Sequence, residues 1–310
     1  MSATKVKKPR MLVSAFLRKY GRILIGGSIL FVIVFGVLFA DVLDGGWSSD
    51  PVKFNADMSD VYLKPGESSF NAQTGKEQVH IFGTDQRGND LWSQLLHAGE
   101  PTLMVAVGAQ VILIILGTVI GLICGYYNKV ERIVMRILEA FATIPNMLLT
   151  MLVLSLFKFD KEKTLLENAL PMMLSLSIHG VPGLARMIRN QVLSLREKEY
   201  IESEKAMGAG DLRTMFVHIL PACSSYLLVR FSNGLAGMVL SMASLSYLGL
   251  GIPVLVAPTW GSIVSENKDA IMNPEHAFVF LIPTLIVSLT VFGFVMLGDG
   301  LRDLFDPRLK

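Results

Sequence analysis

The run from Leu103 to Tyr126 constrains the fold of this chain more than any other stretch. It contains no charged residue, and it has about the length that a helix needs to cross the hydrocarbon core of a bilayer. Gly117, Gly121 and Gly125 recur at every fourth position, so they share one face of that helix. Small residues on one face allow a second helix to approach closely. The run therefore predicts a membrane-spanning helix with a close helical neighbour.

Five further apolar runs indicate that the chain crosses the membrane repeatedly. Hydrophobic residues make up 52% of the chain and charged residues 17%, whereas a soluble domain carries about 25% charged residues. The predicted fold class is all-α, a polytopic membrane protein with about six transmembrane helices. The other predicted spans cover residues 23–40, 137–157, 170–188, 226–248 and 278–297.

The charges between the runs predict the orientation of the chain. Residues 1–22 are basic and contain no acid, which places the N-terminus in the cytoplasm. A cleaved signal peptide is the alternative, but the apolar run is long for one and no convincing small-x-small cleavage site follows. The even number of spans returns the C-terminus to the cytoplasm. The predicted divisions are a cytoplasmic N-terminus (1–22), a first transmembrane helix (23–43), an extracytoplasmic segment (44–100), a transmembrane domain (101–300) with a polar loop (195–221), and a cytoplasmic C-terminus (301–310).

Prolines and glycines predict distortions within these spans. Pro145 should kink the third span. The fourth span should be interrupted, and interrupted helices occur where they face protein or a water-filled cavity. The uncharged run that continues past residue 248 should form an outer, re-entrant segment through Trp260. The residues behind these two predictions are Pro171, His179, Gly180 and Pro182 in the fourth span, and Gly249, Gly251, Pro253 and Pro258 after the fifth.

The stretch from Glu199 to Pro221 is too polar to cross a bilayer, although apolar runs flank it on both sides. Its acidic residues predict a short helix with one polar face. Gly208 and Gly210 should break that helix, after which Asp211 can cap a second one that Pro221 ends. A helix–turn–helix between spans offers a surface to a partner in the aqueous phase. An ordinary solvated loop is the alternative interpretation.

The same stretch resembles the coupling loop, called the EAA loop, of ABC importer permeases. Glu202, Gly208, Leu220 and Pro221 fit the family's spacing, whereas Ser203 and Glu204 replace two alanines and His218 replaces an isoleucine. The resemblance identifies this segment as a cytoplasmic coupling-helix loop. The residues that it implicates in ATPase coupling are Glu202, Ser203, Glu204, Gly208, Ala209, Asp211, His218, Leu220 and Pro221.

Three further stretches resemble the C-type membrane subunit of the dipeptide, oligopeptide and nickel importers. They are residues 80–103, residues 245–251 with 258–261, and residues 297–309. The first contains an expected outer-mouth loop, which should lie near a docked binding protein and includes Gly83, Thr84, Asp85, Gly88 and Asp90. A purely structural turn that shapes the entry into the second span is the alternative interpretation of this loop. The chain departs from the family where Asn89, Gln94 and Glu100 stand in place of arginines, and where Met242 stands at a position that often holds Glu.

The resemblance implies a permease subunit in a bacterial or archaeal cell (inner) membrane, surrounded by lipid. Its implied partners are a second, B-type permease subunit, two cytoplasmic ATP-binding subunits and an extracytoplasmic solute-binding protein. The implied substrates are short peptides or a similar small solute, with nickel or a metal chelate as the alternative. ATP and Mg would bind to the partner ATPase subunits, and this chain would bind no cofactor. The net charge of +2 gives no indication of a nucleic-acid partner.

Motifs for chemistry by the chain itself are absent from the sequence. It has no Gly-x-x-x-x-Gly-Lys-Ser/Thr loop, no His-Glu-x-x-His, no Cys-x-x-Cys and no Gly-x-Ser-x-Gly. We therefore expect no catalytic residue, no metal site and no enzyme activity, and we expect Cys124 and Cys223 to be buried apolar residues. Two alternatives remain. One is an ion-gradient-driven secondary transporter or channel that uses His179, and the other is an intramembrane hydrolase, although Ser177 and His179 would point to different helix faces.

Overall fold

The computed structural model describes residues 9–44, 60–71, 76–160, 162–254 and 256–305. Several predicted features lie outside these residues: the basic residues 1–8, most of the outer segment before residue 60, and the C-terminal residues 306–310. Within the described part the chain is almost entirely helical. This confirms the prediction of an all-α polytopic membrane protein.

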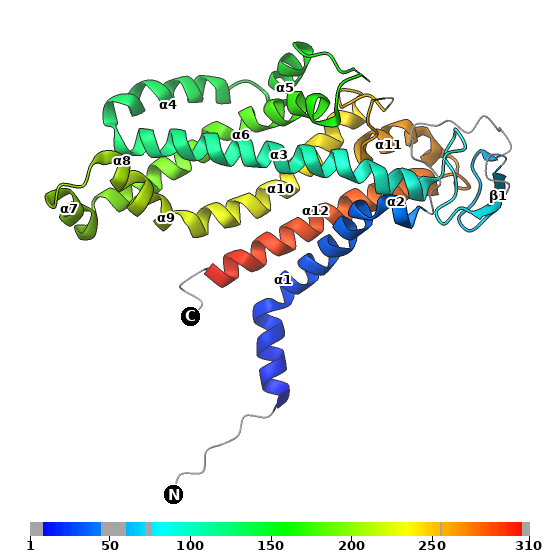
Figure 1. Cartoon of the computed structure of the whole chain (residues 1–310), viewed down its shortest axis with the longest axis horizontal. Coiled ribbons are helices and arrows are strands. Elements are labelled where there is room, and N and C mark those ends of the chain that lie inside the picture. Colours follow the sequence, from blue (N-terminus) through cyan, green and yellow to red (C-terminus); the bar gives the residue numbers. More distant parts are fainter. Residues whose placement is uncertain (1–8, 45–59, 72–75, 161, 255, 306–310) are drawn as a thin grey trace, which may run out of the picture.

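Four helices are long and apolar enough to cross a membrane, among the residues that the structure describes. They lie in α1 (Pro9–Leu38), α3 (Leu91–Tyr126), α10 (Ser224–Tyr247) and α12 (Phe278–Phe305). In Figure 1, α1 runs alongside α12, and α10 lies between α12 and α3. Many of their large apolar side chains are exposed, as expected for surfaces that face lipid or another membrane subunit.

The predicted third span is broken into two helices. α4 (Asn128–Ala142) and α5 (Asn146–Ser155) meet at an angle of 93°. Pro145 lies at the break, where it lacks an N–H group and disfavours a helical conformation at Ile144. The prediction of a distortion was right, but the single span 137–157 and the short basic connection before it were wrong, because helix α4 already begins at Asn128. Counted as one span, the bent pair raises the number of apolar spans to five.

The predicted fourth span is not interrupted, which corrects the prediction from its prolines and glycine. α6 is one helix from Leu165 to Arg196, as long as the spanning helices but less apolar. Pro171 and Pro182 are both buried within it. Neighbouring helices can satisfy the backbone groups that a proline leaves unpaired in such a helix. Thr164 and Glu167 fix its start with a reciprocal capping box.

The glycine face of α3 packs directly against α6, as the sequence predicted. A Cβ atom at Gly117 would lie 2.7 Å from Leu184 Cδ2, and one at Gly121 would lie 2.7 Å from the carbonyl oxygen of Ala185. A Cβ atom at Gly125 would lie 2.5 Å from Val192 Cβ. Such distances are too short for real Cβ contacts, so the two helices approach as closely as they do only because the positions are glycine. The core is centred on this pair and on α10, with buried residues that include Leu113, Leu122, Met172, Ile188, Val239 and Met242.

The end of the molecule at the right of Figure 1 carries short elements between the long helices. They are α2 (Ala40–Leu43), the antiparallel strands β1 (Ser68–Asn71) and β2 (Lys76–Val79), α11 (Trp260–Glu266) and a 3-10 helix, η3 (Lys268–Met272). The outer segment expected through Trp260 ends where α11 begins. The polar loop between α6 and α10 lies at the opposite end of the molecule.

Candidate functional site

The polar loop forms two helical arms that meet at a glycine turn. The first arm is α7 (Glu199–Ala206). Gly208 has a φ of +89°, a left-handed conformation that glycine adopts without strain. The backbone N–H of Ala209 donates to the carbonyl oxygen of Glu204 at 3.0 Å, which closes the end of α7. The predicted helix–turn–helix and the predicted break at Gly208 are therefore confirmed.

The second arm contains a widened turn. α8 (Asp211–Arg213), a π-helix η2 (Thr214–Ile219) and α9 (Leu220–Ala222) follow one another without a break. The arm ends at Ala222, one residue after Pro221 and before α10 begins, close to the predicted end. A proline inside an α-helix removes one hydrogen bond and clashes with the carbonyl group four residues earlier, and a π turn relieves that clash. Gly210, not Asp211, is the N-cap of α8, and no side chain caps this helix.

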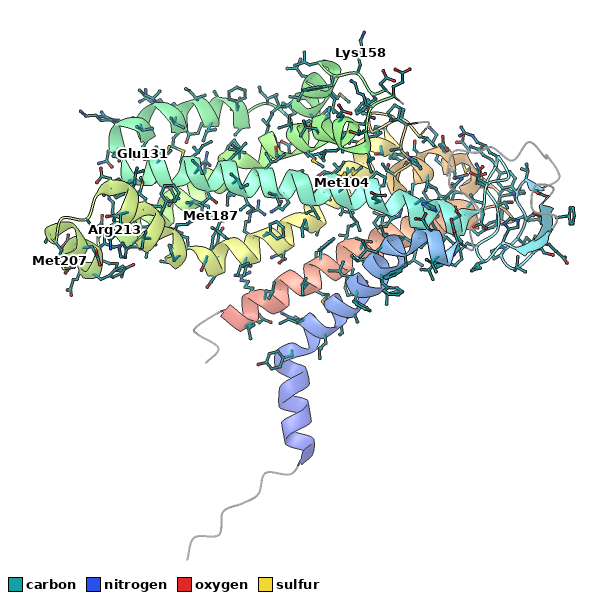
Figure 2. All side chains as sticks on the ribbon, viewed as in Figure 1. Met104, Glu131, Lys158, Met187, Met207 and Arg213 are labelled. Carbon is teal, nitrogen blue, oxygen red and sulfur yellow. The ribbon has the colours of Figure 1, made fainter. Side chains whose placement is uncertain are left out.

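The second arm has a buried face and an exposed apolar face. Met215 and Ile219 are buried and lie on the same side as Ile201 of α7 and the core. Leu212, Phe216 and Val217 are 68%, 47% and 56% exposed, and Met207 at the turn is also largely exposed. Figure 2 shows Met207 and Arg213 at the far end of the molecule, away from the outer elements. Large exposed apolar side chains therefore gather at this end of the molecule. We call this segment, residues 199–222, the coupling segment.

The polar residues predicted in this segment have separate environments. Glu202 and Ser203 are exposed, and the Ser203 hydroxyl donates to the carbonyl oxygen of Glu199 at 2.8 Å. Glu204 of the first arm lies 3.5 Å from Nε2 of His218 in the second arm. This contact brings the two arms together across the turn. Ala209 and Leu220 are partly buried, and Pro221 is exposed.

Two tyrosines that the sequence analysis did not identify bind the coupling segment to α3. The Tyr126 hydroxyl donates to Asp211 Oδ1 at 2.7 Å, and the Tyr127 hydroxyl donates to Asp211 Oδ2 at 3.0 Å. The hydrogen bond to Asp211 raises the pKa of the Tyr127 hydroxyl above its usual value, because the bond favours the protonated phenol. Two adjacent tyrosines at the end of a predicted span are a typical membrane-interface signal, although that signal does not indicate their partner.

Arginines from α6 hold the corner between α3 and α4. Arg196 donates to the carbonyl oxygens of Gly125 and Tyr126 at 3.3 and 3.4 Å, and to Asn128 Oδ1 at 3.0 Å. Arg189, which precedes Arg196 in α6, pairs with Glu131 of α4, and Figure 2 labels Glu131 on that helix. The corner, the start of α4 and the end of α6 are therefore connected by polar contacts.

At the other end of the molecule, the expected outer-mouth loop is shaped by two left-handed glycines. Gly83 and Gly88 have φ values of +76° and +77°. A Cβ atom at Gly83 would lie 2.2 Å from the carbonyl oxygen of Leu63, so only glycine fits there. The buried Thr84 accepts from the Leu63 N–H at 2.8 Å and donates to the carbonyl oxygen of Asp60.

Asp85 and Asp90 organise this loop from within. Asp85 is 2% exposed and accepts four hydrogen bonds: from the N–H groups of Arg87 and Asn89, from Asn89 Nδ2, and from Gln94 Nε2. Asp90 caps α3 by accepting from the Ser93 N–H at 2.7 Å, and its other oxygen lies 2.8 Å from His80 Nδ1. Asp85 therefore has the environment of a structural residue, which favours the structural alternative for this position.

The outer-mouth loop is tied to α11. Arg87 forms an ion pair with Glu266 at 3.1 Å, and Gln86 Nε2 donates to the Glu266 carbonyl oxygen at 2.9 Å. Burial raises the pKa of the Glu266 carboxyl, and the charge of Arg87 opposes that change. The two outer stretches noted in the sequence, residues 80–103 and 258–261, also lie next to each other, because Trp260 donates hydrogen bonds to Leu95 and Thr102.

Residues considered for other chemistry lie elsewhere. His179 is partly buried in the middle of α6, and Ser177 donates its hydroxyl proton to the carbonyl oxygen of Leu174. Cys124 and Cys223 are free and buried, as expected. Among the residues that the structure describes, no group of three or more His, Cys, Asp or Glu side chains is arranged to hold a metal ion.

Comparisons with known proteins bear on the whole chain. Residues 117–310 match the family described as "Binding-protein-dependent transport system inner membrane component". A putative peptide transport system permease protein from Brucella abortus is 31% identical over 98% of this chain and 94% of its own length. The glutathione transport system permease protein GsiD of Pectobacterium atrosepticum is 34% identical over 76% of this chain and 75% of its own length. The dipeptide transport system permease protein DppC of Alkalihalophilus pseudofirmus is 34% identical over 77% of this chain and 76% of its own length.

Proposed function

The chain belongs to the binding-protein-dependent transport system inner membrane components and is a permease subunit of an ABC importer, and we propose that it imports short peptides. The names of the similar proteins refer to peptides, dipeptides and glutathione, a tripeptide derivative. A permease forms a path and performs no covalent chemistry of its own. Nickel or a metal chelate is the competing substrate class, carried over from the resemblance of the sequence.

The observation that carries the proposed mechanism is the exposed apolar face of the coupling segment. Leu212 and Phe216 are large, apolar and exposed at the end opposite the outer-mouth loop. An ATPase subunit with a complementary groove would bury this face, in the way that amphipathic helices bind in hydrophobic grooves. Closure of a pair of ATPase subunits would then displace the second arm, and the long helices would carry the displacement to the pore.

The implied assembly has this chain as half of a heterodimeric pore. A second permease subunit would complete the pore, two ATP-binding subunits would dock on the cytoplasmic side, and a solute-binding protein would deliver substrate from outside. We place both termini and the coupling segment in the cytoplasm. The basic residues 1–22 support this orientation.

The test combines copurification with uptake. We expect the purified chain to bring down ATP-binding subunits, and a deletion strain to lose uptake of labelled di- and tripeptides. Phe216→Glu should lose both the bound ATPase and peptide uptake, because a carboxylate would have to be desolvated at the interface. The control for the loss of bound ATPase is Met272→Glu, which alters another large apolar side chain, 88% exposed, at the opposite end. Loss of nickel uptake alone would overturn the substrate assignment, and uptake that continues without ATPase subunits would favour the ion-gradient alternative.

A further inference from the structure

We propose that Tyr126, Tyr127 and Asp211 form a latch through which the coupling segment moves the corner between α3 and α4 directly. The covalent route from the coupling segment to the membrane runs only through the adjoining helices α6 and α10. The latch adds a second route, to helices that precede α6 in the chain. This inference rests on the proposed function, since it assumes that an ATPase moves the coupling segment. We use the name tyrosine latch for these three residues.

In the tyrosine latch, two hydroxyl groups donate hydrogen bonds to one carboxylate, that of Asp211. Each oxygen of Asp211 accepts from a different hydroxyl, at 2.7 Å from Tyr126 and 3.0 Å from Tyr127. The two rings pack edge to face, with centroids 5.1 Å apart. Hydrogen bonds to a charged acceptor are about twice as strong as neutral ones. Two of them fix the orientation of the carboxylate as well as its position, so the contact can transmit a rotation.

Asp211 lies at the start of the second arm, so its hydrogen bonds to the tyrosines can carry a movement of that arm to α3. Asp211 is the first residue of α8 and lies three positions after Gly208, whose φ is +89° and where an added Cβ atom would meet nothing within 4 Å. The glycine turn is the covalent connection between the two arms, which also meet where Glu204 contacts His218. Through Asp211 the second arm is attached in addition to α3, which is distant in sequence.

The corner between α3 and α4, which binds Asp211, is held in place by several contacts. Tyr126 ends α3 and Tyr127 precedes α4, so the two side chains are fixed to the ends of two helices. Arg196 of α6 binds the backbone of the same corner. Behind the corner, α3 packs against α6 through its glycine face. A displacement of Asp211 would consequently shift α3, α4 and α6 together.

The simpler alternative is that the tyrosines only stabilise the fold of the loop. Both interpretations predict that loss of the hydroxyls weakens transport, but they differ in what else changes. A stabilising contact would alter the amount of assembled transporter and leave uptake per hydrolysed ATP unchanged. A latch would leave assembly intact and lower uptake per ATP.

The first experiment removes the hydroxyls and keeps the rings. The double variant Tyr126→Phe/Tyr127→Phe, reconstituted with its partners, should retain bound ATPase subunits and ATP hydrolysis. Uptake of peptide per ATP should fall about fivefold or more, the lower end of usual coupling between sites. Asp211→Asn should have a smaller effect, because its amide keeps one oxygen to accept a hydrogen bond. Tyr226→Phe, at the start of α10 and outside the latch, is the control and should match the parent.

The second experiment measures the mechanical connection itself. Spin labels on cysteines introduced at Lys129 of α4 and Ala222 of α9, both exposed, report the distance between the corner and the second arm. In the parent transporter this distance should be the same with and without ATP. In the double variant it should change when ATP binds. The native Cys124 and Cys223 are buried and should not take up the label.

The outcomes separate the latch from the proposed function. If no ATPase binds the parent chain, the proposed function fails and the latch fails with it. If the parent transports peptide and the double variant has the parent's uptake per ATP, the latch alone is overturned. A loss of assembled transporter with unchanged uptake per ATP would assign the tyrosines to folding and also overturn it. The latch would also be overturned if the distance between the two spin labels were identical in parent and variant, both with and without ATP.

Discussion

The indole nitrogen of Trp260 donates a 2.8 Å hydrogen bond to the carbonyl oxygen of Leu95, across 165 positions of sequence. Trp260 is 1% exposed, and its backbone N–H donates to the Thr102 hydroxyl at 3.1 Å. Its ring also covers Gly99, where a Cβ atom would lie 3.1 Å from Trp260 Cζ2. Trp260 therefore anchors α11, and with it the outer-mouth loop, to the first turns of α3.

We predict that Trp260→Ala lowers the stability of the transporter by about 3–5 kcal/mol, the usual cost of removing a large buried aromatic side chain. Thermal unfolding of the purified complex measures this loss. Trp92→Ala is the control, because Trp92 is only partly buried and its hydrogen bond to Leu43 is exposed to solvent. Equal losses for the two variants would contradict the anchoring role.

The contact between α3 and α6 gives a second prediction. Gly121→Leu should prevent the close approach of the helices, since even a Cβ atom would lie 2.7 Å from the backbone oxygen of Ala185 and 2.7 Å from Ile188 Cβ. The backbone of α6 at Ala185 cannot move aside to make room, as the end of a flexible side chain could. We expect little folded protein in the membrane, measured by fluorescence size-exclusion chromatography. Gly183→Leu on α6, where a Cβ atom would meet nothing within 4 Å, should fold normally; if it fails equally, the effect is not one of helix approach.

The sequence predicted this helix pair from glycine spacing but could not predict the continuity of α6 or the break between α4 and α5. Both segments contain prolines, Pro171 and Pro182 within α6 and Pro145 between α4 and α5, and the local effect of a proline is the same in each. Pro171 and Pro182 are buried against neighbours, whereas no residue of α4 is buried. Tertiary packing decides whether a proline distorts a helix or breaks it, and that packing involves residues far away in sequence.

Asp85 provides a third prediction. Asp85→Ala should lower the amount of folded protein, because each buried donor left unsatisfied costs about 1–3 kcal/mol and four donors point at this carboxylate. Asp85→Asn should be intermediate, since an amide can replace only one of the two accepting oxygens. Membrane protein level and peptide uptake are measured together. Asp269→Ala, at an exposed outer acid, is the control. Normal protein level with lost uptake would instead assign Asp85 to substrate delivery.

The coupling segment was largely predictable, and the tyrosine latch was not. The glycine turn and the two arms follow from local conformational preferences of Gly208 and of the acidic first arm. Asp211 was identified, but as a helix cap, because an acid after glycine commonly has that role. Its actual partners, Tyr126 and Tyr127, lie about 85 positions earlier. Local pattern carries no information on such a contact.

Orientation in the membrane gives a fourth prediction. A cysteine at Ser68 in β1 should react with a membrane-impermeant thiol reagent added outside intact cells. Cysteines at Lys310 and at Lys129, the exposed start of α4, should react only after the membrane is opened. The physical reason is the excess of basic residues that flanks the first span and the start of α4. Reaction of Ser68→Cys and Lys310→Cys from the same side would refute a topology with both termini in the cytoplasm.

The turn of the coupling segment contains two glycines that differ in backbone conformation and match in surroundings. Gly208 has a φ of +89°, whereas Gly210 has a φ of −70° and a ψ of 156°, which any residue can adopt. A Cβ atom at either position would meet nothing within 4 Å. Replacing them with the same residue therefore isolates the effect of the backbone conformation from that of packing.

We predict that Gly208→Val leaves the membrane helices assembled but abolishes coupled transport, whereas Gly210→Val behaves as the parent protein does. A β-branched residue at positive φ costs about 1–3 kcal/mol, so the turn should relax to another conformation and redirect Leu212 and Phe216 away from the ATPase. Because no core contact is removed, thermal stability of the membrane part should be nearly unchanged. Peptide uptake, ATP hydrolysis and ATPase binding are measured on the reconstituted complex. Full uptake with normal coupled hydrolysis in Gly208→Val would show that the turn does not aim the second arm, and equal defects in both variants would show that bulk at the turn, not its backbone conformation, is responsible.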